Sequence, residues 1–446
     1  MNRSVLYAGC VGFMVACTSP RVVEMPVGLE GDASAAIYFD RDDADDPLRE
    51  LYAEFRARRE RDMRDPSKPP ALPRHPSVHK TREMPWTPID EVLRFDWEAL
   101  RDVSPAAVDQ LDAAVRMRLA FDHPDLKITQ ILIGPGGSLP SHADGAPGLL
   151  IAVGGRGEIT IEGESWLAES GTTAKLEPYD ERRMAAVGDE PFRLLWIRWA
   201  PGGDQSYIDA GYYLTGANAH IQPDQADMPD DYAFWHADYA ASPRERPTRA
   251  VVERKQSADA VAAVREPLGA SRNLYPGVAR FGHESDRAWL SAETLKRGGF
   301  FFSADAGRMG PIVDRMIRIA RHKAIFRASR PDGTWDFNFS QSAWGPRSTY
   351  VEHSHLVPEF YYAMSGPVIY GVDDEAHRLM PGDVVLNNSY APHFIRGIVD
   401  GMAFDTFSST WAPNGDRSVF GRRHYLLEPL PDQPASSALP ADIAFH

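Results

Sequence analysis

The sequence predicts a mainly β protein, and three observations support that prediction. From residue 128 onward, much of the chain is divided into short runs of β-branched, aromatic and other apolar residues, which is typical of strands. Glycine and proline separate the runs, as they do at turns. The runs gather in two regions, residues 125–205 and 320–417, and these two regions share matched landmarks.

Residues 1–17 have the pattern of a secretory signal peptide. A basic start is followed by an apolar core and by Cys17 after a small residue. This pattern resembles a bacterial lipoprotein signal, with Cys17 as the lipidated first residue of an exported protein, and Thr18 favours the outer membrane. An ordinary signal peptide or a short buried helix is the alternative. The other cysteine, Cys10, lies in the same segment, so the remaining chain can form no disulfide.

Residues 18–85 are predicted to form an arm rather than a packed domain. Their acidic, irregular beginning is interpreted as a tether. Asp46 and Pro47 can cap a helix, and apolar residues follow at the spacing of an amphipathic helix. We interpret the arginine-rich run 56–61 as the solvated face of that helix. The proline-rich residues 66–76 predict an extended linker.

Two β-rich domains are predicted, at residues 86–215 and 291–430. A mixed connector at 216–290 joins them, and 431–446 form a C-terminal tail. Helices are expected at 104–115, where a Ser-Pro pair provides the cap, and near 258–264. Strands are expected at 128–133, 149–153, 158–161, 192–199, 324–328, 334–339, 360–364, 368–370, 384–386 and 402–407.

The two β-rich regions look like an internal duplication. When His142 is set against His353, two glycines follow at identical intervals in both regions. The matched glycines are Gly155 with Gly366 and Gly171 with Gly382. The sequence Trp-Ala-Pro then begins at Trp199 and at Trp411, and its distance from the histidine differs between the regions by a single position. Matched landmarks over this length indicate a repeated unit.

Three histidines and a glutamate in the second region have the spacing of a metal site. His353 and His355 are two residues apart, so they point to the same face of a strand. Glu359 keeps that parity if no bulge intervenes, and His393 arrives from a later strand. Nitrogen and oxygen donors of this kind suit one divalent Fe, Mn, Co, Ni, Cu or Zn ion, and they leave positions open for water or substrate.

The pattern H-x-H-x3-E-x6-G, followed by Pro-Gly-Asp at 381–383 and by Pro-His at 392–393, resembles the two metal-binding motifs of the cupin superfamily. The first motif matches at every defining position, whereas the second keeps only its glycine and its histidine. The resemblance covers residues 125–205 and 320–417. It implies a bicupin, with two tandem double-stranded β-helix (jelly-roll) barrels, a helical N-terminal arm and a mixed central connector.

The first region keeps one of the four ligand positions. The second histidine is replaced by Asp144, the glutamate by Gly148 and the third histidine by Arg182. Because the charge of an arginine would repel a cation, we expect no metal in the first domain. His142 is then interpreted as a hydrogen-bonded core residue.

Tyr361 has the same parity as Glu359, so it should point into the barrel near the metal. Its phenol could serve there as a catalytic acid or base, and a buried tyrosine with a structural hydrogen bond is the alternative. Phe360 and Tyr362 have the opposite parity and should pack outward. Three aromatic residues alternate on the candidate strand 334–339, where core packing is favoured over an aromatic pocket.

Three functions fit this site on a small organic substrate. Bicupins with this ligand set resemble quercetin- and gentisate-type dioxygenases, which usually contain iron. The run from His353 to Tyr361 is also similar to cupin lyases that cleave dimethylsulfoniopropionate, in which the tyrosine takes the proton, and an exported location suits those enzymes. A non-catalytic binding cupin is the third alternative. The ligand set, together with the chemistry that is commonest among cupins with this motif, narrowly favours an iron-dependent oxygenase over a lyase or isomerase.

Composition limits the partners. The chain of 446 residues is 43% hydrophobic and 25% charged, as in globular proteins, and its net charge of −15 provides no basic field for nucleic acid. No apolar run reaches the ~18 residues that span a bilayer. We therefore expect no nucleic-acid partner, a periplasmic location, and membrane contact only through a lipid on Cys17. The cupin resemblance also implies pairing into a homodimer.

Overall fold

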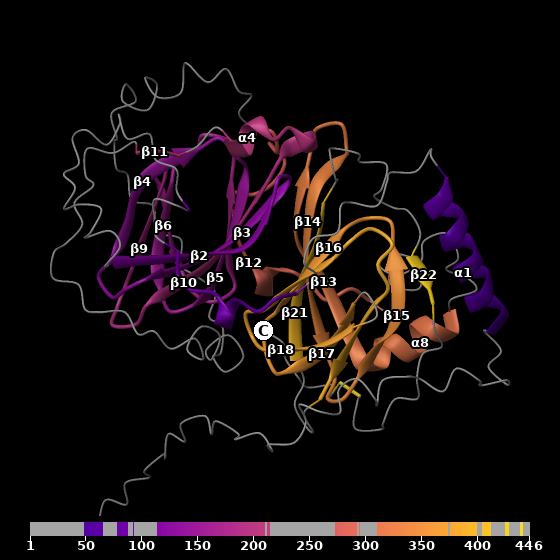
Figure 1. Cartoon of the computed structure of the whole chain (residues 1–446). Helices are drawn as coiled ribbons and strands as arrows, with labels where there is room; N and C mark the ends of the chain where they lie inside the picture. Colours follow the sequence, from indigo (N-terminus) through magenta and orange to yellow (C-terminus); the bar gives the residue numbers. More distant parts are fainter. Residues whose placement is uncertain are drawn as a thin grey trace, which may run out of the picture. The chain divides into compact units, whose positions relative to one another are not determined.

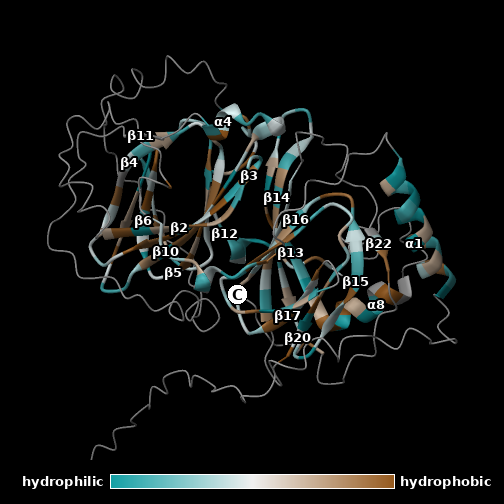
Figure 2. Ribbon diagram, in the orientation of Figure 1, coloured by the Kyte–Doolittle hydropathy of each residue, from teal (hydrophilic) through white to brown (hydrophobic). Residues whose placement is uncertain are grey.

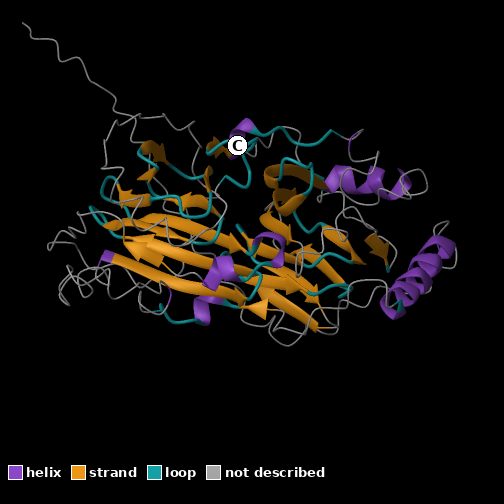
Figure 3. Cartoon of the chain, turned by 90° about the horizontal axis from the view of Figure 1, so that it is seen from above, coloured by secondary structure: helices purple, strands orange, loops and turns teal. Residues whose placement is uncertain are grey.

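The computed structural model describes residues 49–65, 78–87, 92, 114–209, 212–214, 273–291, 294, 310–372, 375–398, 404–411, 424–427 and 438–439. The predicted signal peptide, tether, proline-rich linker and helix near 258–264 lie outside this part of the chain. Strands make up most of what is described (Figure 3). No helix in the described residues is long and apolar enough to cross a membrane.

The N-terminal jelly roll consists of two antiparallel sheets that enclose one hydrophobic core. The sheets have the strand orders β12-β8-β5-β10-β3-β2 and β11-β4-β9-β6-β7. Their strands are β2 (Val115–His123), β3 (Leu126–Ile133), β4 (Ser138–Asp144), β5 (Gly148–Gly154), β6 (Gly157–Ile161), β7 (Glu164–Ala168), β8 (Thr172–Leu176), β9 (Arg182–Ala186), β10 (Phe192–Trp199), β11 (Tyr212–Leu214) and β12 (Phe281–His283).

The C-terminal jelly roll repeats this plan with the strand orders β1-β19-β16-β21-β14-β13 and β22-β15-β20-β17-β18. A second hydrophobic core lies between these two sheets. Their strands are β1 (Val78–His79), β13 (Ala320–Ser329), β14 (Trp335–Trp344), β15 (Thr349–His355), β16 (Glu359–Ala363), β17 (Val368–Val372), β18 (Glu375–Leu379), β19 (Val384–Asn387), β20 (His393–Gly397), β21 (Phe404–Trp411) and β22 (His424–Leu426).

The matching strand orders show that the two halves share one fold. Backbone details recur at corresponding positions of the two halves: φ is 65° at Gly155 and 67° at Gly366, and it is 62° at Tyr179 and 65° at Tyr390. A non-glycine residue with positive φ is uncommon, so its recurrence at the same turn is informative. The structure therefore agrees with the duplication that the sequence indicates, and the fold is mainly β, with two tandem jelly rolls.

Each jelly roll gains one edge strand from a distant segment. β1 lies in the predicted arm and pairs with β19, and β12 lies in the predicted connector and pairs with β8. The helix expected at 104–115 is wrong at its end, because Val115 begins β2; residues 104–113 lie outside the described chain. Every predicted β-like run overlaps an observed strand, and the run 192–199 coincides with β10.

The outer faces of the two six-stranded sheets contribute to one shared hydrophobic cluster. Phe337 stacks on Trp199 with ring centroids 4.5 Å apart. Phe360 and Tyr362 lie in the same cluster, on the face opposite to Tyr361, as strand alternation predicts. The aromatic residues of β14 therefore include core residues of this cluster, as the sequence favoured.

The predicted arm helix is α1 (Arg49–Arg64), and its buried residues Leu51, Tyr52 and Phe55 belong to the core of the C-terminal jelly roll. Most of α1 is hydrophilic, whereas the strands alternate between hydrophobic and hydrophilic residues (Figure 2). The interpretation of run 56–61 as merely solvated is wrong in part, because Arg56 and Arg59 donate hydrogen bonds to backbone carbonyls. Other short helices are η1 (Thr81–Glu83), η2 (Pro201–Gly203), α4 (Ser206–Asp209), η5 (Glu284–Asp286) and α8 (Gly310–Ile319).

Candidate metal centre

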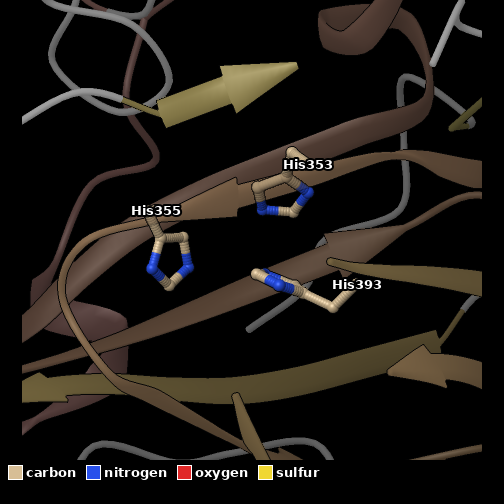
Figure 4. A group of neighbouring side chains, drawn as sticks. All are labelled: His353, His355 and His393. Atoms are coloured by element: carbon tan, nitrogen blue, oxygen red, sulfur yellow. The ribbon is translucent and has the colours of Figure 1, made fainter. Parts of the chain in front are cut away.

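Three histidines converge inside the C-terminal jelly roll. His353 and His355 lie on β15, and His393 begins the neighbouring strand β20, directly opposite His353. One ring nitrogen from each histidine lies within 4.8 Å of the others. Figure 4 shows the rings turned toward a common space. All three side chains are buried, so the nitrogens form an interior cluster rather than a surface patch.

Each histidine is oriented by a hydrogen bond between its Nδ1 and a backbone carbonyl two residues away. His353 Nδ1 lies 2.9 Å from Val351 O, and His393 Nδ1 lies 2.8 Å from Ala391 O. His355 Nδ1 bonds to Val357 O in the same way. Because a carbonyl can only accept, Nδ1 must carry the proton, and Nε2 of each ring is the nitrogen that can bind a metal.

Glu359 reaches the cluster from the facing sheet. The sequence placed it on the same strand as the histidines, but a turn follows His355 and Glu359 begins β16. The parity argument is therefore wrong, but the Glu359 carboxylate still reaches the histidines. Its Oε2 lies 2.9 Å from His355 Nε2 and 3.7 Å from His393 Nε2. His355 Nε2 thus faces the Glu359 carboxylate, and both atoms can donate a lone pair to one cation.

The surroundings of His353 favour the neutral form of its imidazole. Burial lowers the pKa of His353 well below its usual value, and the nearby His393 and His355 lower it further. A neutral imidazole is the form that donates a lone pair to a metal. The donor set of three imidazoles and one carboxylate therefore fits a divalent transition metal.

Tyr361 lies on the inner face of β16, beside the histidines, with its ring centroid 6.5 Å from that of His393. Tyr370 lies 5.2 Å from Tyr361 and parallel to His393, and Tyr350 lies 4.4 Å from His353. Burial raises the pKa of all three phenols well above its usual value, and the charge of Glu359 raises it further. The phenols therefore stay protonated and can donate hydrogen bonds.

Sequence reasoning missed Tyr350, Tyr370 and the Asn387 amide that donates to the Tyr370 hydroxyl at 2.7 Å. A shift in strand register between Tyr350 and His353 brings Tyr350 toward the site, and a period-two count from His353 excludes it. Tyr370 lies on β17, whose register against β20 the sequence did not specify. The sequence signal that could have indicated these tyrosines was their occurrence within the β-like runs.

The N-terminal jelly roll has a different chemistry at the matching positions. Arg182 Nε donates to His142 Nε2 at 3.2 Å, and Nη2 donates to the Asp144 carboxylate. His142 is fully buried, so it is a hydrogen-bonded core residue, as the sequence indicated. The guanidinium takes the place that the third histidine has in the second half.

No protein-family model matches the chain, and no curated protein matches it. Among solved structures, it is similar to salicylate 1,2-dioxygenase from Pseudoaminobacter salicylatoxidans with gentisate, at 16% identity and a TM-score of 0.47, covering 86% of this chain and 94% of that one. It is also similar to Bacillus subtilis oxalate decarboxylase, at 13% identity and a TM-score of 0.40, covering 67% and 72%. The duplicated strand order and register show two tandem jelly rolls, which is the architecture that the cupin resemblance of the sequence implies.

Proposed function

We propose that the chain is an exported, metal-dependent bicupin enzyme that acts on a small organic substrate in its C-terminal jelly roll. One observation carries the proposal: three buried histidines commit Nδ1 to backbone carbonyls, which directs Nε2 of each ring to one place. Structural histidines rarely need this shared arrangement, whereas metal ligands regularly have it.

His353, His355, Glu359 and His393 would hold the metal, and their donor atoms suit iron first, with manganese, nickel, copper, cobalt or zinc as alternatives. A redox metal there supplies electron transfer between oxygen and a substrate, whereas a redox-inert one supplies only polarisation. Four protein donors leave open positions for a substrate or for oxygen.

The chain's own residues define what the site accepts. Tyr361 and Tyr370 present phenol groups beside the ligands, and their protonated hydroxyls can donate to the oxygen atoms of a substrate. Apolar residues such as Val385 and Ile395 belong to the surrounding core and limit the entry of water. Such surroundings suit a compact aromatic or carbonyl compound that carries oxygen substituents.

We favour dioxygenase chemistry, because the nitrogen-rich ligand set with open positions suits a redox metal. The test is oxygen uptake by anaerobically iron-loaded protein with phenolic or diketone substrates. The proposal predicts one oxygen molecule consumed per substrate, and no uptake by the His355→Ala variant. Substrate turnover without oxygen consumption would contradict the oxygenase.

The alternative is a metal-dependent lyase or isomerase, because Tyr361 lies beside His393. Burial and Glu359 raise the pKa of the Tyr361 phenol, so this alternative requires a bound metal to lower that pKa again. In that reaction the deprotonated Tyr361 would take a proton from the carbon next to the substrate carboxylate, and the C–H electron pair would form the new double bond as the leaving group departs with its own bonding pair. Turnover of dimethylsulfoniopropionate without oxygen, lost in Tyr361→Phe, would support this alternative. Full activity of Tyr361→Phe would remove the tyrosine base.

We also propose that a lipid on Cys17 anchors the protein to the outer membrane and that two chains pair. The lipoprotein-type signal at residues 1–17 supports the first part. Cys17→Ala should abolish incorporation of labelled palmitate and move the protein out of the membrane fraction. Light scattering of the purified protein distinguishes a dimer from a monomer.

A further inference from the structure

Helix α1 packs against the C-terminal jelly roll. It runs beside β22, which is the strand that pairs with β15 opposite His353 and His355 (Figure 1). Leu51, Tyr52 and Phe55 anchor it, since they belong to the same buried core as the residues of β22. The helix is therefore packed on the strand that borders the ligand strand.

Arg59 binds the turn that precedes His393. Its Nε and Nη2 donate to the same carbonyl, Tyr390 O, at 3.0 and 2.6 Å. A fork of two charge-assisted hydrogen bonds fixes both the position and the direction of that peptide group. Tyr390 has a positive φ of 65°, a conformation that its surroundings must hold in place.

The turn at Tyr390 also forms hydrogen bonds with two of the proposed ligands. Tyr390 N donates to His355 O at 2.7 Å, and the next residue, Ala391, accepts the hydrogen bond of His393 Nδ1 at 2.8 Å. Arg59 is thus one peptide group away from the contacts that orient His355 and His393. Arg59 contacts neither His355 nor His393 through these bonds, so through them it acts on the site by positioning the ligands.

Two more contacts tie α1 to the other side of the ligand strand. Arg56 Nη1 donates to Leu427 O, and the Tyr425 hydroxyl donates to the Asp62 carboxylate. Tyr425 lies on β22 opposite Ser354, between the two histidines of β15. The helix therefore contacts both segments that support the ligands, β22 and the Tyr390 turn.

We propose that α1 is a strap that holds the metal ligands in position, with Arg59 as its main positioning residue. The inference depends on the proposed metal site and adds a role for the N-terminal arm. Loss of a residue that orients a ligand typically lowers metal affinity about 10–100-fold. Because Arg59 acts one peptide further away, we expect an increase of about tenfold in the rate of metal release in Arg59→Ala.

The test measures the release of Zn²⁺ from loaded full-length protein to excess chelator. Arg59→Ala should release Zn²⁺ about tenfold faster than wild type. Arg59→Lys keeps a charged donor group but has a single nitrogen in place of the two that contact Tyr390 O, so its release should be intermediate. Arg61→Ala is the matched control, because Arg61 is exposed on the same helix, and it should release at the wild-type rate. Melting of the metal-free variants separates positioning from stability, since a merely structural role would lower the melting temperature without changing release.

If Arg59→Ala fails to fold, Tyr425→Phe tests the second contact, with a smaller increase expected. Release at the wild-type rate from a folded Arg59→Ala protein would overturn the strap. Wild-type protein that holds no Zn²⁺ would instead overturn the proposed metal site, so the two failures are distinguishable.

Discussion

The two jelly rolls present the same backbone at the ligand positions but opposite chemistry. In both halves the strand register shifts just before the first histidine, at His142 and at His353. In the C-terminal half, imidazoles and a carboxylate face a common space. In the N-terminal half, the Arg182 guanidinium lies between His142 and Asp144 and supplies a positive charge from the chain itself.

The remaining space in the N-terminal half is filled. Gly148 stands where Glu359 stands in the other half, and a Cβ atom there would lie 3.0 Å from Trp196 Nε1 and 3.0 Å from Ile197 O. The guanidinium carbons of Arg182 and Arg198 lie 4.7 and 4.6 Å from the centroid of the Trp196 ring. The comparison teaches that the N-terminal half has a built-in cation at the position where the C-terminal half has the proposed metal ligands.

The largest effect that tests this difference is loss of metal. Combined His355→Ala and Glu359→Ala substitutions should abolish metal content, because two of the four donors disappear. His142→Ala should leave metal content unchanged, because that imidazole is bonded to Arg182. Elemental analysis after gel filtration measures the metal content of both variants. Metal retained in the double variant would place the site elsewhere. A halved metal content in His142→Ala would mean that both halves bind metal.

The next effect is on stability. Arg182→Met leaves the Asp144 carboxylate buried without its guanidinium, and breaking a buried pair costs about 3–5 kcal/mol. Urea unfolding should show this loss with metal content unchanged. Arg183→Met, one residue along β9 and partly exposed, is the control and should cost much less. Adding Asp144→Leu to Arg182→Met should restore part of the lost unfolding free energy. An Arg182→Met protein with the unfolding free energy of wild type would contradict the built-in cation.

A third predicted effect concerns acid. Met117 pairs with Ile131 in the N-terminal half, whereas His322 pairs with Ser342 at the matching place in the C-terminal half. Burial lowers the pKa of His322 to about 3 from its usual 6.5. As the pH falls, the unfolded chain therefore takes up a proton before the folded protein does, so the stability that is complete above pH 6.5 is lost progressively toward pH 3.

His322→Met gives the C-terminal half the apolar residue of the other half. Urea titrations between pH 7 and pH 4 should show a shallower decline of unfolding free energy in this variant than in wild type. Equal slopes would mean that other groups account for the acid sensitivity.

The sequence predicted much of this fold because its signals are local. Apolar strands such as β3 and β10 follow from runs of β-formers, and the duplication follows from spacing alone. Polar strands such as β4 and β18 lack that signal, and sequence reasoning did not predict them. The edge strands β1 and β12 depend on pairing with distant partners, which no local pattern reports.

The candidate site, like the fold, could be predicted from the sequence only where its signal is local. The spacing of His353 and His355 on one strand gave their shared face. Glu359 reached the site by a turn between sheets rather than by strand parity, and Tyr350 by a register shift, so neither route follows from a count of residues. The contact of Arg59 with Tyr390 spans the chain and is visible only in the structure.

The central claim is that a duplicated fold retains one metal site. The most direct test is the number of Zn²⁺ ions that the full-length wild-type protein holds after loading with excess Zn²⁺ and gel filtration. The account predicts one ion per chain. Two ions per chain would contradict the built-in cation of the N-terminal half, and none would contradict the metal centre of His353, His355, Glu359 and His393.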